Sequence, residues 1–227
     1  MPLLDMVGVD ACQRSFCIAF AFLSGEQEED YAWAQERLRS LYEACDAKLP
    51  SVVLSDCCVA CLNAIDAVLP EAKSLLCLWH ANKAVLAHCL PIFTLQEHLA
   101  AGIAADASAK RGSGSAGWAD FYNFWHSIMQ SPTEAEINKR VTAFEEKYLP
   151  SHAEEVAYVK KTCLQPYKEK LVKAWVDLYM HFGNSVTSRV EGIHALLKSY
   201  LKTSKFDLFD VWRTIKHAVE NQLSELQ

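Results

Sequence analysis

Residues 51–80 give the clearest indication of the fold class. They read SVVLSDCCVACLNAIDAVLPEAKSLLCLWH. Short apolar runs at residues 51–55 and 74–78 predict two strands, because such runs bounded by turn residues are typical of buried strands. The segment from about Cys57 to Val68 predicts a helix, which Pro70 ends. Strand, helix and strand in succession indicate an α/β fold.

The residues before this stretch continue the same pattern. Apolar runs at residues 3–9 and 16–23 predict two further strands, and residues 10–14 predict the hairpin connection between them. A helix is predicted over residues 26–47, with acidic residues in its first turn and apolar residues at helical spacing. Those apolar positions are Tyr31, Ala34, Leu38, Leu41 and Cys45.

After residue 90 only helical patterns occur. The Gly-, Ser- and Ala-rich residues 106–117 predict a loop. An amphipathic helix is predicted from Tyr167 to His181, and two helices are predicted at about 188–202 and 207–224. The predicted order is therefore strands and helices first, then helices alone.

Composition and charge exclude several classes of protein. The 227 residues are 51% hydrophobic and 22% charged, which argues against a disordered chain. The net charge of −6 argues against a simple basic protein that coats DNA. No apolar run reaches the roughly 18 residues of a membrane helix, and the N-terminus lacks the basic region of a signal peptide. Nine cysteines without a secretory signal favour a reducing compartment.

The charge is unevenly distributed along the chain. Residues 1–159 carry 11 basic and 21 acidic side chains, whereas residues 160–227 carry 11 basic and 7 acidic ones. An anionic partner near the C-terminal third would explain this asymmetry. The alternative explanation is a set of solvated helix faces.

Two acidic residues stand at positions where a catalytic metal ligand is expected. Asp56 follows the predicted strand at 51–55, and the carboxyl end of such a strand is where α/β folds place ligands. The alternative is that Asp56 caps the next helix. Glu191 lies in Ser-x-x-Glu, residues 188–191, so it has a structural role available in a capping box.

A third pattern contains cysteine and histidine. Cys77 and His80 have a Cys-x-x-His spacing, and thiolate and imidazole are ligands that zinc prefers. A structural zinc site needs four ligands, so these two would need others, such as Cys57 and Cys61. The alternative is that Cys77 is a small buried apolar residue and His80 a histidine of the core.

These pieces in this order resemble the catalytic domain of Mutator-like (MULE) transposases. The resemblance rests on a strand ending in Asp56, on the apolar strand leading to Cys-x-Trp-His at residues 77–80, and on a helix reading RVEGIHALLK, residues 189–198. It extends over nearly the whole chain, except the stretch near residues 90–117.

The resemblance implies an RNase H-like fold that is interrupted by a helical insertion. Residues 1–90 would hold the first strands and helices of the core, residues 91–183 the insertion, and residues 184–227 the C-terminal helices that carry the glutamate. Two aspartates and one glutamate would bind two divalent ions, Mg²⁺ or Mn²⁺, for phosphodiester cleavage and strand transfer. Asp56 matches the second aspartate and Glu191 the glutamate. Cys77 and His80 match the Cys-x-x-His signature.

The first catalytic aspartate of the family has no counterpart here, because the chain starts at the segment that follows it in the family. Asp5 and Asp10 are the nearest acids, and neither matches. We therefore expect an RNase H-like sheet without its first strand and a domain that is inactive as written.

The partner implied by the resemblance is DNA, with Arg189, Lys198 and Lys202 as candidate contacts. A nuclear location and a homo-oligomer are also implied. A different class of function remains open from the sequence, namely a domesticated or degenerate module that binds DNA or a protein without catalysis.

Overall fold

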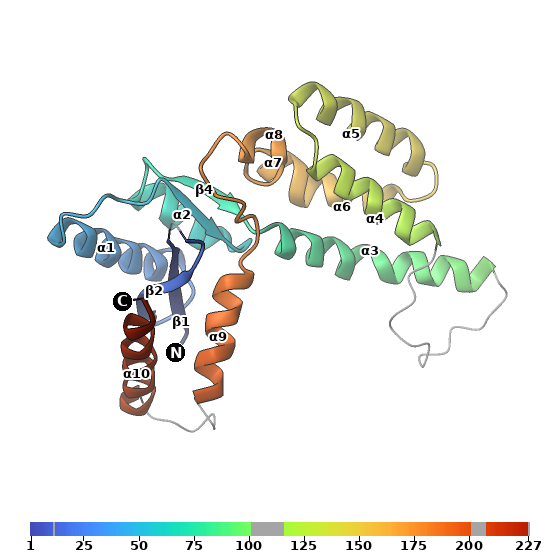
Figure 1. Ribbon diagram of the computed structural model, residues 1–227. Helices are drawn as coiled ribbons and strands as arrows, with labels where there is room; N and C mark the ends of the chain where they lie inside the picture. Colours follow the sequence, from blue (N-terminus) through green and yellow to red (C-terminus); the bar gives the residue numbers. More distant parts are fainter. Residues whose placement is uncertain (11, 101–115, 201–207, 227) are drawn as a thin grey trace. The chain divides into compact units, whose positions relative to one another are not determined.

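The computed structural model describes residues 1–10, 12–100, 116–200 and 208–226 (Figure 1). The chain divides into two compact units. We call residues 1–50, 58–72 and 186–227 the hairpin unit, and residues 51–57 and 73–185 the helical unit. None of the nine cysteines, all of which are among the described residues, forms a disulfide bond.

Within its described residues, the hairpin unit contains two strands and four helices. They are β1 (Leu3–Val9), β2 (Ser15–Phe22), α1 (Glu28–Ala44), α2 (Val59–Val68), α9 (Ser188–Tyr200) and α10 (Leu208–Leu226). The two strands pair in antiparallel fashion, with Leu3 opposite Phe22 and Val9 opposite Ser15. This pairing confirms the hairpin that the sequence predicts.

The turn of the hairpin is built by Asp10. Its Oδ1 accepts hydrogen bonds from the backbone N–H groups of Cys12 (2.9 Å) and Arg14 (2.7 Å). Gln13 adopts a left-handed backbone conformation with φ of 62°. Next to the turn, Gly8 lies opposite Phe16, and a Cβ at Gly8 would lie 2.5 Å from the Phe16 ring. The absence of a side chain at Gly8 therefore makes room for that ring.

Helix α1 forms where the sequence predicts it. Its start has a capping box made by Gln27 and Asp30, and the acidic residues of its first turn suit the positive end of the helix dipole. Of the five apolar positions, Tyr31, Ala34 and Leu38 are buried, whereas Leu41 and Cys45 near the end of the helix are exposed. The Nδ2 of Asn63 on α2 donates to a Glu28 carboxylate oxygen at 2.7 Å, so α1 and α2 are also joined by a polar contact.

The helical unit contains the other two strands and most of the helices. They are β3 (Val52–Ser55), β4 (Lys73–Leu76), α3 (Leu78–Ala100), α4 (Ala116–Met129), α5 (Glu134–Tyr148), α6 (Ala153–Val159), the π-helix η1 (Lys160–Leu164), α7 (Gln165–Leu171) and α8 (Lys173–Val176). The strands are parallel, with Val52 opposite Lys73 and Ser55 opposite Leu76. Residues 118–181, all of which are described, contain no strand, as predicted.

The core of the helical unit is aromatic. Phe121, Trp125 and Phe144 are each 0% exposed. The Phe121 and Phe144 ring centroids lie 5.0 Å apart, and the Trp125 indole N–H donates to the Asn82 side-chain oxygen at 2.8 Å.

One predicted helix is interrupted. Instead of running from Tyr167 to His181, the chain leaves the helical conformation at Val172, whose φ and ψ are −88° and 137°. The Val172 side chain is 0% exposed. Burial of this residue in the core outweighs the local helical periodicity, and α8 begins directly after it.

The mixed α/β class is confirmed. Among the described residues, however, the strands form two separate two-stranded sheets, β1 with β2 and β3 with β4, instead of one. The RNase H-like sheet therefore stays a prediction, as does the division at residues 90 and 183.

Candidate functional site

Asp56 immediately follows β3 in the helical unit, where the sequence predicts a ligand. The residue is exposed. The next helix, α2, begins at Val59 with Cys58 at its N-cap and without a side-chain capping bond. Asp56 therefore does not cap α2, and within the described residues its carboxylate has no hydrogen bond or ion pair. The structural alternative for Asp56 loses its support.

Cys77 and His80 lie at the junction of β4 and α3. The Cys77 N–H donates to the Ser55 carbonyl oxygen at 2.8 Å, and its side chain is 0% exposed. His80 is half-buried, with its ring 4.7 Å from that of Trp79. Among the residues that the structure describes, no group of three His, Cys, Asp or Glu side chains is arranged to hold a metal ion. The zinc site stays an untested prediction.

Glu191 lies in the first turn of α9 in the hairpin unit. Its N–H donates to the Thr187 carbonyl oxygen at 3.1 Å, and the helix begins at Ser188. The start of the helix thus lies one residue earlier than the Ser-x-x-Glu pattern predicts. Glu191 is exposed, whereas Ile193 on the same helix packs into the core. Because Asp56 belongs to the other unit, the convergence of Asp56 and Glu191 stays a prediction.

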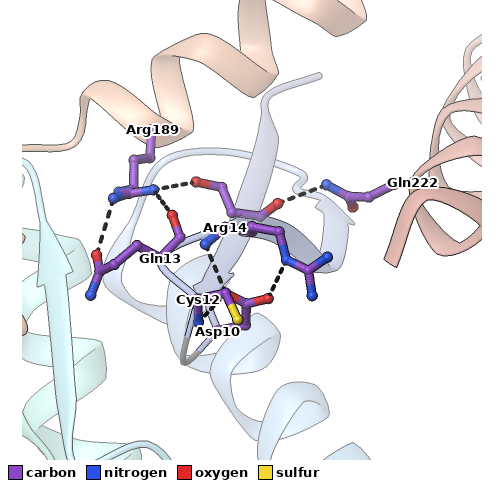
Figure 2. A network of polar contacts seen from close by, with 7 residues as sticks. Asp10, Cys12, Gln13, Arg14, Arg189 and Gln222 are labelled. Atoms are coloured by element: carbon purple, nitrogen blue, oxygen red, sulfur yellow. Dashed lines mark hydrogen bonds and ion pairs between the residues drawn. The ribbon is translucent and has the colours of Figure 1, made fainter. Parts of the chain in front are cut away.

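Arg189 is held by the hairpin turn (Figure 2). One guanidinium nitrogen, Nη1, donates to the Gln13 carbonyl oxygen (2.6 Å) and to Ser15 Oγ (3.1 Å), and Nη2 donates to Gln13 Oε1 at 3.2 Å. These bonds give Arg189 a structural role, which is to fix the start of α9 on the turn. Its predicted contact with DNA is untested. The Lys198 side chain and Lys202 lie outside the described residues.

Gln222 on α10 contacts the same region (Figure 2). Its Oε1 accepts from the Cys17 N–H at 2.8 Å, and its Nε2 donates to the Ser15 carbonyl oxygen at 3.1 Å. Together with Arg189, this residue joins both C-terminal helices to β2. Neither residue gives a signal in the sequence that would identify its partner.

Asp5 is an acid whose environment the sequence analysis did not anticipate. It lies on β1 between Leu3 and Val7, which pack against Ile193 and Ile215, and its carboxylate oxygens have no hydrogen-bond partner among the described residues. Burial raises the pKa of Asp5 to about 7. His194 Nε2 lies 3.6 Å from Asp5 Oδ2. The period-two spacing of Leu3, Asp5 and Val7 is the signal that places Asp5 on the buried face.

The first part of the chain, which includes Asp56, is similar to a known family. Residues 1–84 match the model of the MULE transposase domain family. This match confirms the family resemblance over β1 to β4, α1, α2 and the first turns of α3. The MULE segment includes Asp56, Cys77 and His80, whereas Glu191 and Arg189 lie beyond it. No curated protein matches the chain. Within the described residues, none of the helices combines the length and apolarity needed to cross a membrane.

Proposed function

We propose that this chain is the DNA-processing domain of a MULE-type transposase, in which Asp56 and Glu191 are two of the acids that bind divalent metal ions. The transposase relationship rests on the family match over residues 1–84. The observation that carries the assignment of Asp56 is its position, directly after β3, exposed and not used to cap α2.

The chemistry of these side chains fits Mg²⁺ or Mn²⁺. Both are hard cations that take oxygen ligands, and both candidate residues present an exposed carboxylate. When bound, a pair of such ions stabilises the attacking and leaving oxygens of a phosphodiester. Asp56 would hold an ion from the end of a strand and Glu191 from the first turn of α9. The bonds of Arg189 to the hairpin turn fix the start of α9 and thereby position Glu191.

We further propose that residues 1–227 alone do not cleave DNA. The family's chemistry needs three acids. Asp5 and Asp10 are the aspartates nearest in sequence to the missing one, and neither is suited to bind a metal ion. Asp5 is buried, and burial raises its pKa to about 7. Asp10 accepts hydrogen bonds from the Cys12 and Arg14 backbone and from the Arg14 side chain, and these bonds lower its pKa. Two carboxylates would retain weak binding of a cation.

The lack of a third acid also supports a second candidate function. A module that binds DNA or a protein without cleaving it needs the fold but not the third acid. In both functions the partner that the family implies is DNA, and the compartment it implies is the nucleus.

Binding of Mn²⁺ to the purified chain, followed by electron paramagnetic resonance, tests the assignment. We expect weak binding that Asp56→Asn and Glu191→Gln each reduce. The matched control is Asp46→Asn. Asp46 is exposed, and its φ of 51° is a conformation that asparagine also adopts. Equal Mn²⁺ binding by wild type and both variants would overturn the assignment.

A plasmid-nicking assay with Mg²⁺ or Mn²⁺ tests the proposed lack of cleavage. We expect no nicking by residues 1–227. Nicking that Asp56→Asn abolishes would contradict the proposed incompleteness while supporting Asp56 as a catalytic residue.

A further inference from the structure

The helical unit carries a basic surface although the chain as a whole is acidic. Residues 160–176 contain five lysines and one glutamate, in a protein of net charge −6. We call Lys73, Lys168, Lys170 and Lys173, together with the rings of Trp175 and Tyr179, the lysine–aromatic surface. These residues come from β4, α7, α8 and the segment that follows α8.

Contacts between these elements hold the surface together. The Lys170 ammonium group on α7 donates to the buried Ser74 hydroxyl on β4. The neighbouring Lys73 lies over the Tyr179 ring, 5.2 Å from its centroid. Lys168 lies over the Trp175 ring at 5.3 Å. The elements α7, α8 and β4 are labelled in Figure 1. Cations and rings are therefore interleaved on one part of the helical unit.

Two of the four lysines of this surface are not neutralised by ion pairs within the described residues. Lys73 and Lys168 have no acidic partner within ion-pair distance in the described part of the chain. Lys173 pairs with Asp177 at 3.8 Å, but both side chains are about half exposed, so this pair contributes little. Besides Asp177, Glu169 is the other acid of residues 160–177. A polyanion is the partner whose charge complements this surface.

Large apolar side chains continue the surface into solvent. Around Tyr179, the exposed fractions are 72% for Leu178, 70% for Met180 and 68% for Phe182. Phe182 also has a left-handed backbone, with a φ of 52°. Apolar and aromatic side chains beside lysines are the pattern that binds unpaired nucleic-acid bases, whose faces are accessible only outside a duplex.

A hollow adjoins the surface on its α7 side. It has a volume of about 570 Å³ and lies between α5 and the η1–α7 turn. Lys168 lines it together with Lys160 and with the polar side chains of Asn138, Thr142 and Gln165. Lys168 thus belongs to both the hollow and the lysine–aromatic surface. The hollow therefore extends the surface on which the phosphates of a bound strand would lie.

From these observations we infer that the lysine–aromatic surface binds single-stranded DNA, with lysines on the phosphates and the aromatic and apolar side chains on the bases. This inference deepens the proposed function, since it names where the DNA substrate is held. It differs from the predicted contacts at Arg189, Lys198 and Lys202, which lie further along the sequence.

The test is fluorescence anisotropy of the purified chain with a labelled oligothymidylate and with its duplex, in the presence of EDTA. Because no divalent ion is present, the result is independent of the metal-binding role proposed for Asp56 and Glu191. We expect the single strand to bind more tightly than the duplex. The variant Lys73→Gln/Lys168→Gln should weaken binding and reduce the salt dependence, log K against log salt, by about 1.4, since each phosphate contact contributes about 0.7.

The control for charge is Arg37→Gln/Lys48→Gln, which removes two exposed cations from the hairpin unit. We expect this variant to bind like wild type. Equal binding and equal salt dependence in wild type and in the Lys73/Lys168 variant would overturn the inference.

A second variant tests the role of the bases. Phe182→Asn keeps a residue that tolerates a positive φ, so the fold should persist, which circular dichroism checks. Loss of one stacked base should weaken binding of the single strand about tenfold and leave the duplex unaffected. Equal binding of both DNA forms, with no effect of Phe182→Asn, would contradict the assignment to single strands.

Discussion

The two units cover their small sheets in different ways. In the hairpin unit, β2 is contacted by side chains from the far end of the chain, and 205 positions separate Cys17 from its partner Gln222. In the helical unit, β4 is buried and the core consists of aromatic residues from neighbouring helices. In the hairpin unit, long-range polar contacts thus add to the packing of β1 on Ile193 and Ile215, whereas the helical unit has an aromatic core.

The largest expected effect is at the centre of the helical unit. Trp125→Ala removes a 0% exposed indole and its bond to Asn82, and we expect a loss of about 3–5 kcal/mol in the free energy of unfolding. Urea denaturation followed by circular dichroism measures it. Trp33→Ala, at a half-exposed site on α1, should change this free energy by less than about 0.5 kcal/mol.

Hydrogen exchange shows how far the two units are independent. After Trp125→Ala, we expect faster exchange in α4 and α5 and unchanged protection in β1 and β2. Equal loss of protection in the hairpin would show that the two units unfold together, and would contradict their independence.

A smaller effect is expected from the polar contacts of the hairpin unit. Gln222→Ala leaves the Cys17 N–H and the Ser15 carbonyl without their side-chain partner, at a cost of about 1–3 kcal/mol. Amide exchange at Cys17 should accelerate. The control on the same helix, Ser224→Ala, removes only a bond to the Glu220 carbonyl and should leave the Cys17 amide protected. Unchanged exchange after Gln222→Ala would contradict the importance of this contact.

The effect at Asp5 depends on pH. Its pKa is raised from 3.8 to about 7, so the folded state binds the proton more tightly than the unfolded state. Stability contributed by the protonated carboxyl is complete below about pH 4 and is lost as the pH rises to about 7. Asp5→Asn should therefore stabilise the protein increasingly from pH 4 to 7 and by a constant amount above. His194 and Cys17 are the titratable groups that face Asp5.

Asp10→Asn provides a control of opposite sign. Hydrogen bonds from Arg14 lower the pKa of Asp10, so its removal should destabilise the protein at neutral pH and have less effect in acid. Denaturation midpoints measured between pH 4 and 8 check both variants. A stabilisation by Asp5→Asn that does not change with pH would contradict the buried, titrating carboxyl.

Local patterns in the sequence were sufficient to predict the strands and helices near the N-terminus. The apolar runs predicted all four strands to within about two residues, and the spacing of Tyr31, Ala34 and Leu38 predicted the buried face of α1. These features depend on side-chain periodicity and turn residues, which lie within a few positions of one another.

Features that depend on distant residues could not be predicted in this way. The break at Val172 results from burial in the core, which overrides a helical pattern. The strands pair within two separate sheets, and pairing between strands is not encoded in the period of either one. The roles of Asp5, Arg189 and Gln222 each depend on a partner more than 170 positions away. For Asp56, the local pattern was sufficient to predict that the residue follows a strand, whereas its role as a metal ligand stays a prediction.

The amide of Gln222 has a consequence for association between copies of the protein. It presents one acceptor and one donor to Cys17 and Ser15, as the backbone of a neighbouring strand would. The open edge of a strand is a template for another chain, and natural proteins block such edges. Gln222 on helix α10 therefore covers the edge of β2 at Ser15 and Cys17. A shortened chain that ends before Gln222 would expose that edge to a strand from another copy.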